Sequence, residues 1–220
     1  MMCHSALVVR YLLTHPDEPL SAVKPVRITG HIASLKWSRP AYVRKLKKMM
    51  GDAVDYARMP SEDFAAVNIE FATPDGQLAI GEATTSWSFV GAGLRLSAEL
   101  LGPEYSMKWN SLDSGLQLFF SREVSGRAGE DLVEKQNAEQ GVMPVVPEEY
   151  HAYGYTGEDR HFVRVFLGKE KPRLTFDDGL EVVNMLMTAY QSAELGKTLS
   201  YPPKGIDTFV PKVAKGTWKP

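Results

Sequence analysis

Apolar and polar positions alternate most regularly between residues 63 and 89. Val67, Ile69 and Phe71 are separated by small or polar residues, and a Pro-Asp-Gly turn at residues 74–76 then returns the chain. A period of two residues, followed by a turn of this composition, is typical of a β-hairpin. The sequence therefore predicts two antiparallel strands here.

Similar patterns along the rest of the chain predict the other elements. The expected order begins with a helix over 5–14, a strand over 26–37, a helix over 38–51, the hairpin, a second hairpin over 93–111 and a strand over 115–123. A long loop over 124–147 follows, then helices over 156–168 and 175–196, and a short strand in a proline-rich tail. Short turns between strands favour a mostly antiparallel sheet with one free face. Neither a repeat nor a linker divides the chain, so we predict one α+β domain over residues 1–220.

Helix boundaries and faces follow from caps and from helical spacing. Two Thr-x-x-Asp sequences, at Thr156 and Thr175, predict capping boxes at the starts of the last two helices. The expected buried faces are Leu7, Val8, Tyr11 and Leu12 in the first helix, Phe162, Val163, Phe166 and Leu167 in the next-to-last, and Leu180, Val183, Leu186, Met187 and Tyr190 in the last.

Composition places the chain among ordinary globular proteins. The 220 residues are 44% hydrophobic and 24% charged, and the formal net charge is -2, which gives no broad electrostatic attraction to nucleic acid or to an anionic membrane. Cys3 is the only cysteine, so no internal disulfide is possible and a cytoplasmic location is the default expectation. Arg10 and His15 interrupt the first apolar stretch well short of a membrane span.

Two short motifs suggest cofactor or metal binding, and neither suffices. The stretch GAGLRL at residues 91–96 begins like a dinucleotide fingerprint, but Leu96 replaces the third glycine and the context is a strand. Glu148, Glu149, His151 and His161 lie close in sequence at spacings that match no metal motif. We therefore expect no cofactor-binding residue and no metal site in this chain.

His4 stands next to the start of the first predicted helix. A neutral imidazole in such a place can act as a general base or a hydrogen-bond partner. A single histidine near a terminus is more often structural or simply exposed, so only the surrounding sequence can favour a catalytic role.

The surrounding sequence resembles a known family. The stretches MMCHS, ASLKWSRPAY, VDYARMPSEDFAAVNIEF, TSWSF and FLGKEKPRLTFDDGLEVVNMLMTAYQSAELGKTLSYP are similar to the C-terminal, substrate-side domain of the Gfo/Idh/MocA oxidoreductases. These are NAD(P)-dependent enzymes that act mostly on sugars, polyols and related compounds. The resemblance implies a large, mostly antiparallel sheet with helices on one face, which members of the family use to form oligomers.

The resemblance also implies a role for His4. In the family a D-x-x-x-H motif leads into this domain, and its histidine lies beside the substrate. MMCH matches the last four positions, which makes His4 the catalytic candidate and leaves the aspartate one residue before Met1. The chain then looks truncated inside the motif, without the nucleotide-binding domain that holds NAD or NADP, and we expect it to be inactive alone.

Lys36, Trp37 and Arg39 are the candidate substrate contacts. Two cations beside a tryptophan can offer hydrogen bonds and an apolar face to a sugar-like ligand. The alternative is a strand end whose cations lie along apolar surface with their charges in water.

Three hypotheses follow for the whole chain. It is the substrate-binding and oligomerisation part of an oxidoreductase, a non-catalytic small-molecule-binding module, or a dimeric scaffold domain. For the first and third we expect pairing through the free sheet face, with side chains from TTSWSF, LRLSAEL and GLQLFF forming an apolar patch.

Overall fold

The computed structural model describes residues 2–51, 61–88, 95–103, 106–111, 117–120, 141–144 and 149–217. Within it the chain forms two compact units, which are treated separately below. The first unit comprises Met1–Ser88 and Leu174–Pro220, and the second comprises Phe89–Arg173.

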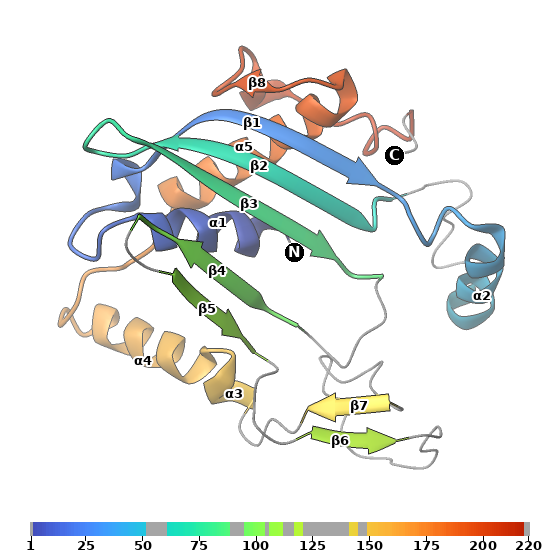
Figure 1. Ribbon diagram of the computed structural model, residues 1–220, viewed down its shortest axis with the longest axis horizontal. Helices are drawn as coiled ribbons and strands as arrows, with labels where there is room; N and C mark the ends of the chain where they lie inside the picture. Colours follow the sequence, from blue (N-terminus) through green and yellow to red (C-terminus); the bar gives the residue numbers. More distant parts are fainter. Residues whose placement is uncertain are drawn as a thin grey trace. The chain divides into compact units, whose positions relative to one another are not determined.

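The first unit is built on a four-stranded antiparallel sheet (Figure 1). Its strands are β1 (Lys24–Ala33), β2 (Phe64–Ala72), β3 (Leu78–Ser86) and β8 (Leu199–Ser200), in the order β3-β2-β1-β8. The predicted hairpin is confirmed as β2 and β3, which pair from Phe64 opposite Ser86 to Ala72 opposite Leu78. Gly76 occupies the turn with a φ of 79°, a conformation that glycine adopts without strain.

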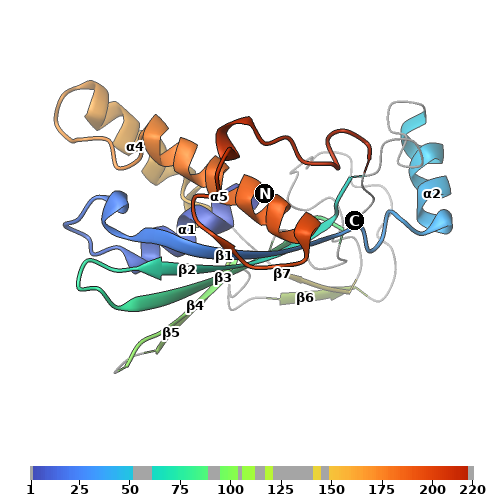
Figure 2. The same cartoon turned by 90° about the horizontal axis from the view of Figure 1, so that it is seen from above.

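Helices α1 (Met2–Leu13) and α5 (Phe176–Leu195) cover one face of this sheet (Figure 2). The strands meet them at glycines, because the absent Cβ atoms of Gly30 and Gly81 leave room for the Ala189 backbone and the Val9 side chain. The core contains Ala6, Val23, Ile28, Val67, Ile69, Phe71, Val182, Met185 and Ala189. The predicted α+β class, with a mostly antiparallel sheet and helices packed on one face, is confirmed.

The ends of α5 lie where the sequence predicted them. Thr175 and Asp178 form the expected capping box, with the Asp178 N–H donating to Thr175 Oγ1 and the Thr175 N–H donating to Asp178 Oδ2. Gly196 ends the helix with a φ of 62°. A further helix, α2 (Pro40–Met50), is closed by Gly51 as predicted, but it begins at Pro40 with Arg39 as its N-cap and not at Ser38.

The predicted buried faces of α1 and α5 are correct only in part. Leu7 and Leu186 pack against the core, whereas Val8, Tyr11, Leu180 and Val183 are exposed. The fully buried positions are Ala6 and Arg10 in α1, and Val182, Met185, Thr188, Ala189 and Ser192 in α5. The contact with Gly30 is made by the backbone of Ala189, so a small residue occupies the closest approach of α5 to the sheet, and Leu180 and Val183 lie on another face of the helix.

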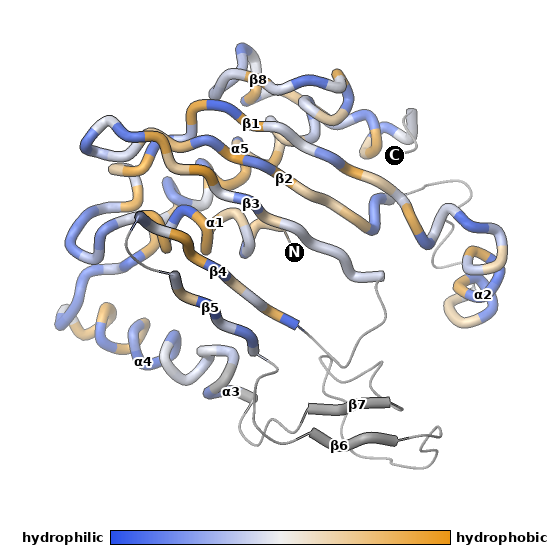
Figure 3. Tube along the Cα trace, in the orientation of Figure 1, coloured by the Kyte–Doolittle hydropathy of each residue, from blue (hydrophilic) through white to orange (hydrophobic). Residues whose placement is uncertain are grey.

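The opposite face of the sheet is more polar than predicted. Arg27 and Glu70 form an ion pair across β1 and β2, and Asn68 donates to Glu82 across β2 and β3. Figure 3 shows hydrophilic and hydrophobic stretches in turn along β1. Leu78 and Ile80 are the large apolar side chains that β3 exposes.

The second unit contains two further antiparallel strand pairs. These are β4 (Ser97–Leu101) with β5 (Ser106–Asn110), and β6 (Gln117–Phe120) with β7 (Gly141–Pro144). The strands that we expected in one sheet are therefore divided among three sheets in the described residues. β7 also lies inside the predicted 124–147 loop, most of which is outside the described residues.

Helices α3 (Glu149–Ala152) and α4 (Tyr155–Phe166) complete the second unit. The capping box predicted at Thr156 is wrong, because the helix is already under way there and its N-cap is Gly154 in the left-handed conformation. The predicted apolar face of α4 is exposed, and the helix has no buried residue. Among the described residues, no helix is long and apolar enough to cross a membrane.

Candidate functional site

The loop between β1 and α2 holds Lys36 and Trp37 together. The Lys36 ammonium donates to the Ser88 carbonyl oxygen at 2.9 Å, and it lies 4.9 Å from the centroid of the Trp37 ring and 5.5 Å from that of Tyr42. A cation at this distance is attracted to the face of an aromatic ring. The structure thus places the Lys36 ammonium beside the Trp37 ring and adds Tyr42 and Ser88 to them.

Three aromatic rings form the wall of this cluster. Trp37 stacks on Trp87 with the ring centroids 5.7 Å apart and the planes inclined by 28°, and Tyr42 meets Trp37 edge-on at 6.3 Å. Trp37 and Trp87 come from the loops that follow β1 and β3. We call Lys36, Trp37, Tyr42, Trp87 and Ser88 the lysine–tryptophan cluster.

The buried Asp63 carboxylate holds the backbone of this loop by hydrogen bonds. Asp63, only 1% exposed, accepts hydrogen bonds from the backbone N–H groups of Leu35, Lys36 and Trp37 at 2.8, 2.8 and 2.9 Å. An ionised carboxylate accepting three N–H bonds satisfies groups that a tight loop would otherwise leave unpaired. No role for Asp63 was predicted from the sequence.

Glu62 links the cluster to α5. Its backbone oxygen accepts a hydrogen bond from Trp87 Nε1 at 3.2 Å, and its carboxylate accepts one from the Tyr190 hydroxyl. Burial, reinforced by this bond and by the charge of Glu62, raises the pKa of Tyr190 above its ordinary value. The neutral phenol is therefore the form that the fold stabilises.

The raised pKa of Tyr190 predicts an alkaline loss of stability. Its contribution is complete below the unfolded-state pKa of about 10 and is lost as the pH rises above that value. Chemical denaturation between about pH 9 and 11.5 should show the free energy of unfolding falling more steeply for the wild type than for Tyr190→Phe. Tyr11→Phe, at an exposed tyrosine, should follow the wild type, and equal slopes for all three proteins would refute the assignment.

Arg39 lies at the start of α2 and outside the cluster. Its Nε atom donates to the Leu35 carbonyl oxygen at 3.1 Å, and the side chain is exposed. The structure therefore places Arg39 beside the loop that carries Lys36, as part of the loop's own hydrogen bonding.

His4 lies in the first turn of α1, which begins at Met2 and so before the predicted start at residue 5, and its side chain is exposed. Two residues earlier, Met2 Sδ accepts a hydrogen bond from Thr85 Oγ1 near the end of β3. Because Trp87 and Ser88 directly follow that strand, the start of α1 and the lysine–tryptophan cluster lie toward the same end of the sheet. His4 makes no hydrogen bond with any residue that the structure describes.

A hollow lies along the edge of β1. It has a volume of about 400 Å³ and is lined by Thr29–Ala33, Phe64, Ala193 and Gly196–Thr198. The Ser192 hydroxyl, which accepts from the Gly30 N–H and donates to the Lys197 carbonyl oxygen, fixes the adjoining end of α5. Ala33 leads from this hollow directly into the loop of the cluster.

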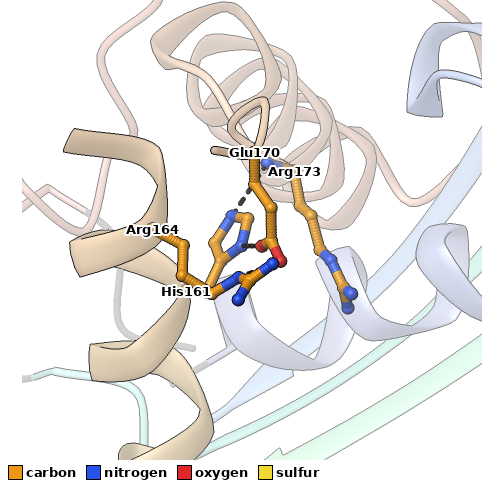
Figure 4. Close-up of polar contacts among 4 residues, drawn as sticks. All are labelled: His161, Arg164, Glu170 and Arg173. Atoms are coloured by element: carbon orange, nitrogen blue, oxygen red, sulfur yellow. Dashed lines mark hydrogen bonds and ion pairs between the residues drawn. The ribbon is translucent and has the colours of Figure 1, made fainter. Parts of the chain in front are cut away.

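His161 belongs to a separate polar contact in the second unit (Figure 4). Its Nδ1 atom lies 2.9 Å from Glu170 Oε2, and its Nε2 atom accepts a hydrogen bond from the Arg173 N–H at 3.3 Å. Arg164 also binds Glu170, and these bonds hold the pKa of the Glu170 carboxyl below its usual value. Both ring nitrogens are occupied in holding the loop after α4, which is a structural role.

The other suggested motifs are described only in part, and Glu148 lies outside the described residues. Across the described ranges, no three His, Cys, Asp or Glu side chains gather in an arrangement that could hold a metal ion. Gly91 and Gly93 of the fingerprint-like stretch lie outside the described residues.

Solved structures share the fold of this chain, whereas comparisons of its sequence find no match. Neither protein-family profiles nor curated protein sequences match the chain. Its fold is similar to that of GenD2. That protein, from gentamicin A biosynthesis and solved in complex with NAD, is 26% identical with a TM-score of 0.63, over 90% of this chain and 46% of GenD2.

A second solved structure is similar in fold alone. The myo-inositol 2-dehydrogenase from Lactobacillus plantarum is 17% identical with a TM-score of 0.51, over 91% of this chain and 47% of its own. The chain therefore spans about half the length of either solved protein.

The residues around the cluster that the sequence did not predict come from distant segments. Asp63 lies just before β2, Trp87 just after β3 and Tyr190 in α5, and strand pairing and helix packing bring these segments together. The one local signal is that Asp63 directly precedes the regular alternation of β2.

Proposed function

We propose that this chain is the substrate-binding part of an NAD(P)-dependent oxidoreductase of the Gfo/Idh/MocA type, acting on a sugar, polyol or related compound. The lysine–tryptophan cluster is the observation that carries the proposal. It presents a cation and aromatic surface in a fold similar to that of a protein solved with NAD. A cytoplasmic location, suggested by the single cysteine, completes the proposal.

The cluster has the chemistry that a polyhydroxylated ligand requires. An ammonium carries three donors, of which Lys36 uses one on Ser88, so the others can reach ligand hydroxyls. Trp87 is about half exposed and offers an apolar face to the C–H side of a sugar ring. Arg39, exposed beside the loop, is the further substrate contact that we propose.

His4 is the proposed acid/base residue. Its place in the first turn of α1, toward the same end of the sheet as the cluster, supports this role. In catalysis the imidazole would exchange a proton with the substrate hydroxyl, and NAD or NADP, when bound, would exchange the hydride. We propose that a nucleotide-binding domain supplies that cofactor and that this chain alone is inactive.

Titration calorimetry with NAD and NADP tests the proposal that a separate domain, and not this chain, binds the nucleotide. The sequence contains no complete dinucleotide fingerprint or P-loop, so we expect neither nucleotide to give saturable heat with the isolated chain. Micromolar binding of either nucleotide would contradict the assignment of this chain to the substrate side.

We also propose that the chain forms a dimer through the sheet face opposite α1 and α5. Leu78 and Ile80, each 59% exposed, give this face an apolar area that a two-fold pairing would bury twice. Light scattering at micromolar concentration should report at least twice the chain mass, and Ile80→Glu should shift the protein toward monomer. A wild-type monomer would exclude this interface.

A further inference from the structure

Two hydrogen bonds fix the backbone of Asp63. Its N–H donates to the Ala33 carbonyl oxygen at 3.1 Å, and its own carbonyl oxygen accepts from the Ser86 hydroxyl at 2.8 Å. The backbone of Asp63 is thus tied to the last residue of β1 and the last residue of β3. Its buried carboxylate has little freedom and acts as a fixed point at this end of the sheet.

The loop is folded around that fixed point. Three consecutive N–H groups, from Leu35 to Trp37, converge on the carboxylate, as backbone groups converge on a bound anion. Here the anion belongs to the chain itself. The bonds involve both carboxylate oxygens, so they fix the orientation of the loop backbone as well as its position.

The side chains that leave this loop form the lysine–tryptophan cluster. Lys36 leaves toward Ser88, and Trp37 leaves toward Trp87, so both point to residues that follow β3. Loss of the carboxylate would free the loop without removing either side chain.

From this geometry we infer that Asp63 is the positioning residue of the proposed substrate site. It does not touch the ligand, and it sets the places of the Lys36 ammonium and the Trp37 ring for a polyhydroxylated ligand. The inference rests on the proposed function.

Asp63→Asn is the variant that tests it. Oδ1 of Asp63 accepts one N–H and Oδ2 accepts two, whereas an amide has only one accepting oxygen. The amide NH₂ group must therefore face at least one backbone N–H, a contact between two donors. Asp17→Asn, at a carboxylate with a 92% exposed side chain, is the matched control.

Amide hydrogen exchange followed by NMR separates positioning from general stability. In Asp63→Asn we expect exchange at Lys36 and Trp37 to be at least about tenfold faster, while Val67 and Ile69 in β2 stay within about threefold of the wild type. Protected loop amides would overturn the inference. Equal losses in loop and strand would also overturn it, because they indicate a merely structural role.

Binding of myo-inositol, measured by ligand-observed NMR on the same samples, supplies the functional readout. We expect the affinity of Asp63→Asn to be at least about tenfold lower and that of Asp17→Asn to be unchanged. Unchanged binding with a mobile loop would overturn the inference. If the wild type binds no polyol, the proposed function fails, and the exchange contrast still decides whether Asp63 holds the loop.

A second variant covers the case in which Asp63→Asn does not fold. Ser86→Ala removes the hydrogen bond to the Asp63 carbonyl oxygen, together with the contacts of this hydroxyl with the Ser88 N–H and hydroxyl, and leaves the carboxylate in place. We expect about threefold faster exchange at Lys36 and Trp37, again without change at Ile69. Unaltered exchange at the Lys36 and Trp37 amides would contradict the inference that Asp63 positions the loop.

Discussion

Replacing Gly30 by alanine is expected to lower the free energy of unfolding by about 3 kcal/mol or more. A Cβ at this position would lie 2.2 Å from the Ala189 carbonyl oxygen and 2.8 Å from its carbonyl carbon. Both are backbone atoms of α5, so no side-chain rotation relieves the overlap, and the helix must move. That movement would also break the hydrogen bond from the Gly30 N–H to Ser192.

Gly179→Ala is the matched control for this experiment. Gly179 lies in the first turns of α5 and has nothing within 4 Å of its ideal Cβ position. The same chemical change should therefore raise the free energy of unfolding by up to about 1 kcal/mol, through helix propensity. Denaturant titration measures both variants, and equal effects would show that α5 does not press on β1 at Gly30.

Replacing Lys36 by methionine is expected to weaken polyol binding by about tenfold or more, because a charge-assisted hydrogen bond contributes about 1.5–3 kcal/mol. Methionine keeps much of the apolar stem and removes the donors and the charge. The bond to Ser88 and the contact with the Trp37 ring are lost with them.

Lys24→Met serves as the control, since Lys24 is exposed at the opposite end of β1. It should leave binding unchanged, as measured by ligand-observed NMR with myo-inositol. Equal affinities for the wild type and Lys36→Met would mean that the cluster is only a strand end with a snorkelling cation.

Features set by neighbouring residues were predictable from the sequence. The β2–β3 hairpin depends on alternation and a three-residue turn, and the α5 cap depends on Thr175 and the residue three places later. Lys36 and Trp37 were found together because they are adjacent along the chain. Each of these predictions needed only local physics.

The errors arise where tertiary contacts decide. Periodicity places Leu180 and Val183 on the buried face of α5, but both are exposed, because Gly30 admits the backbone of Ala189 and the helix turns that face to the sheet. Thr156 failed as a cap because the preceding Gly154 already supplies a left-handed start. Asp63 was missed because its value depends on three N–H groups more than 25 residues away in sequence.

Ligand-observed NMR of the wild-type chain with myo-inositol and D-glucose tests the central claim most directly. The account predicts saturation transfer from the protein to at least one of them, lost in Lys36→Met and retained in Lys24→Met. No transfer to either ligand from a folded wild-type chain would contradict the proposal that this chain forms a sugar- or polyol-binding site.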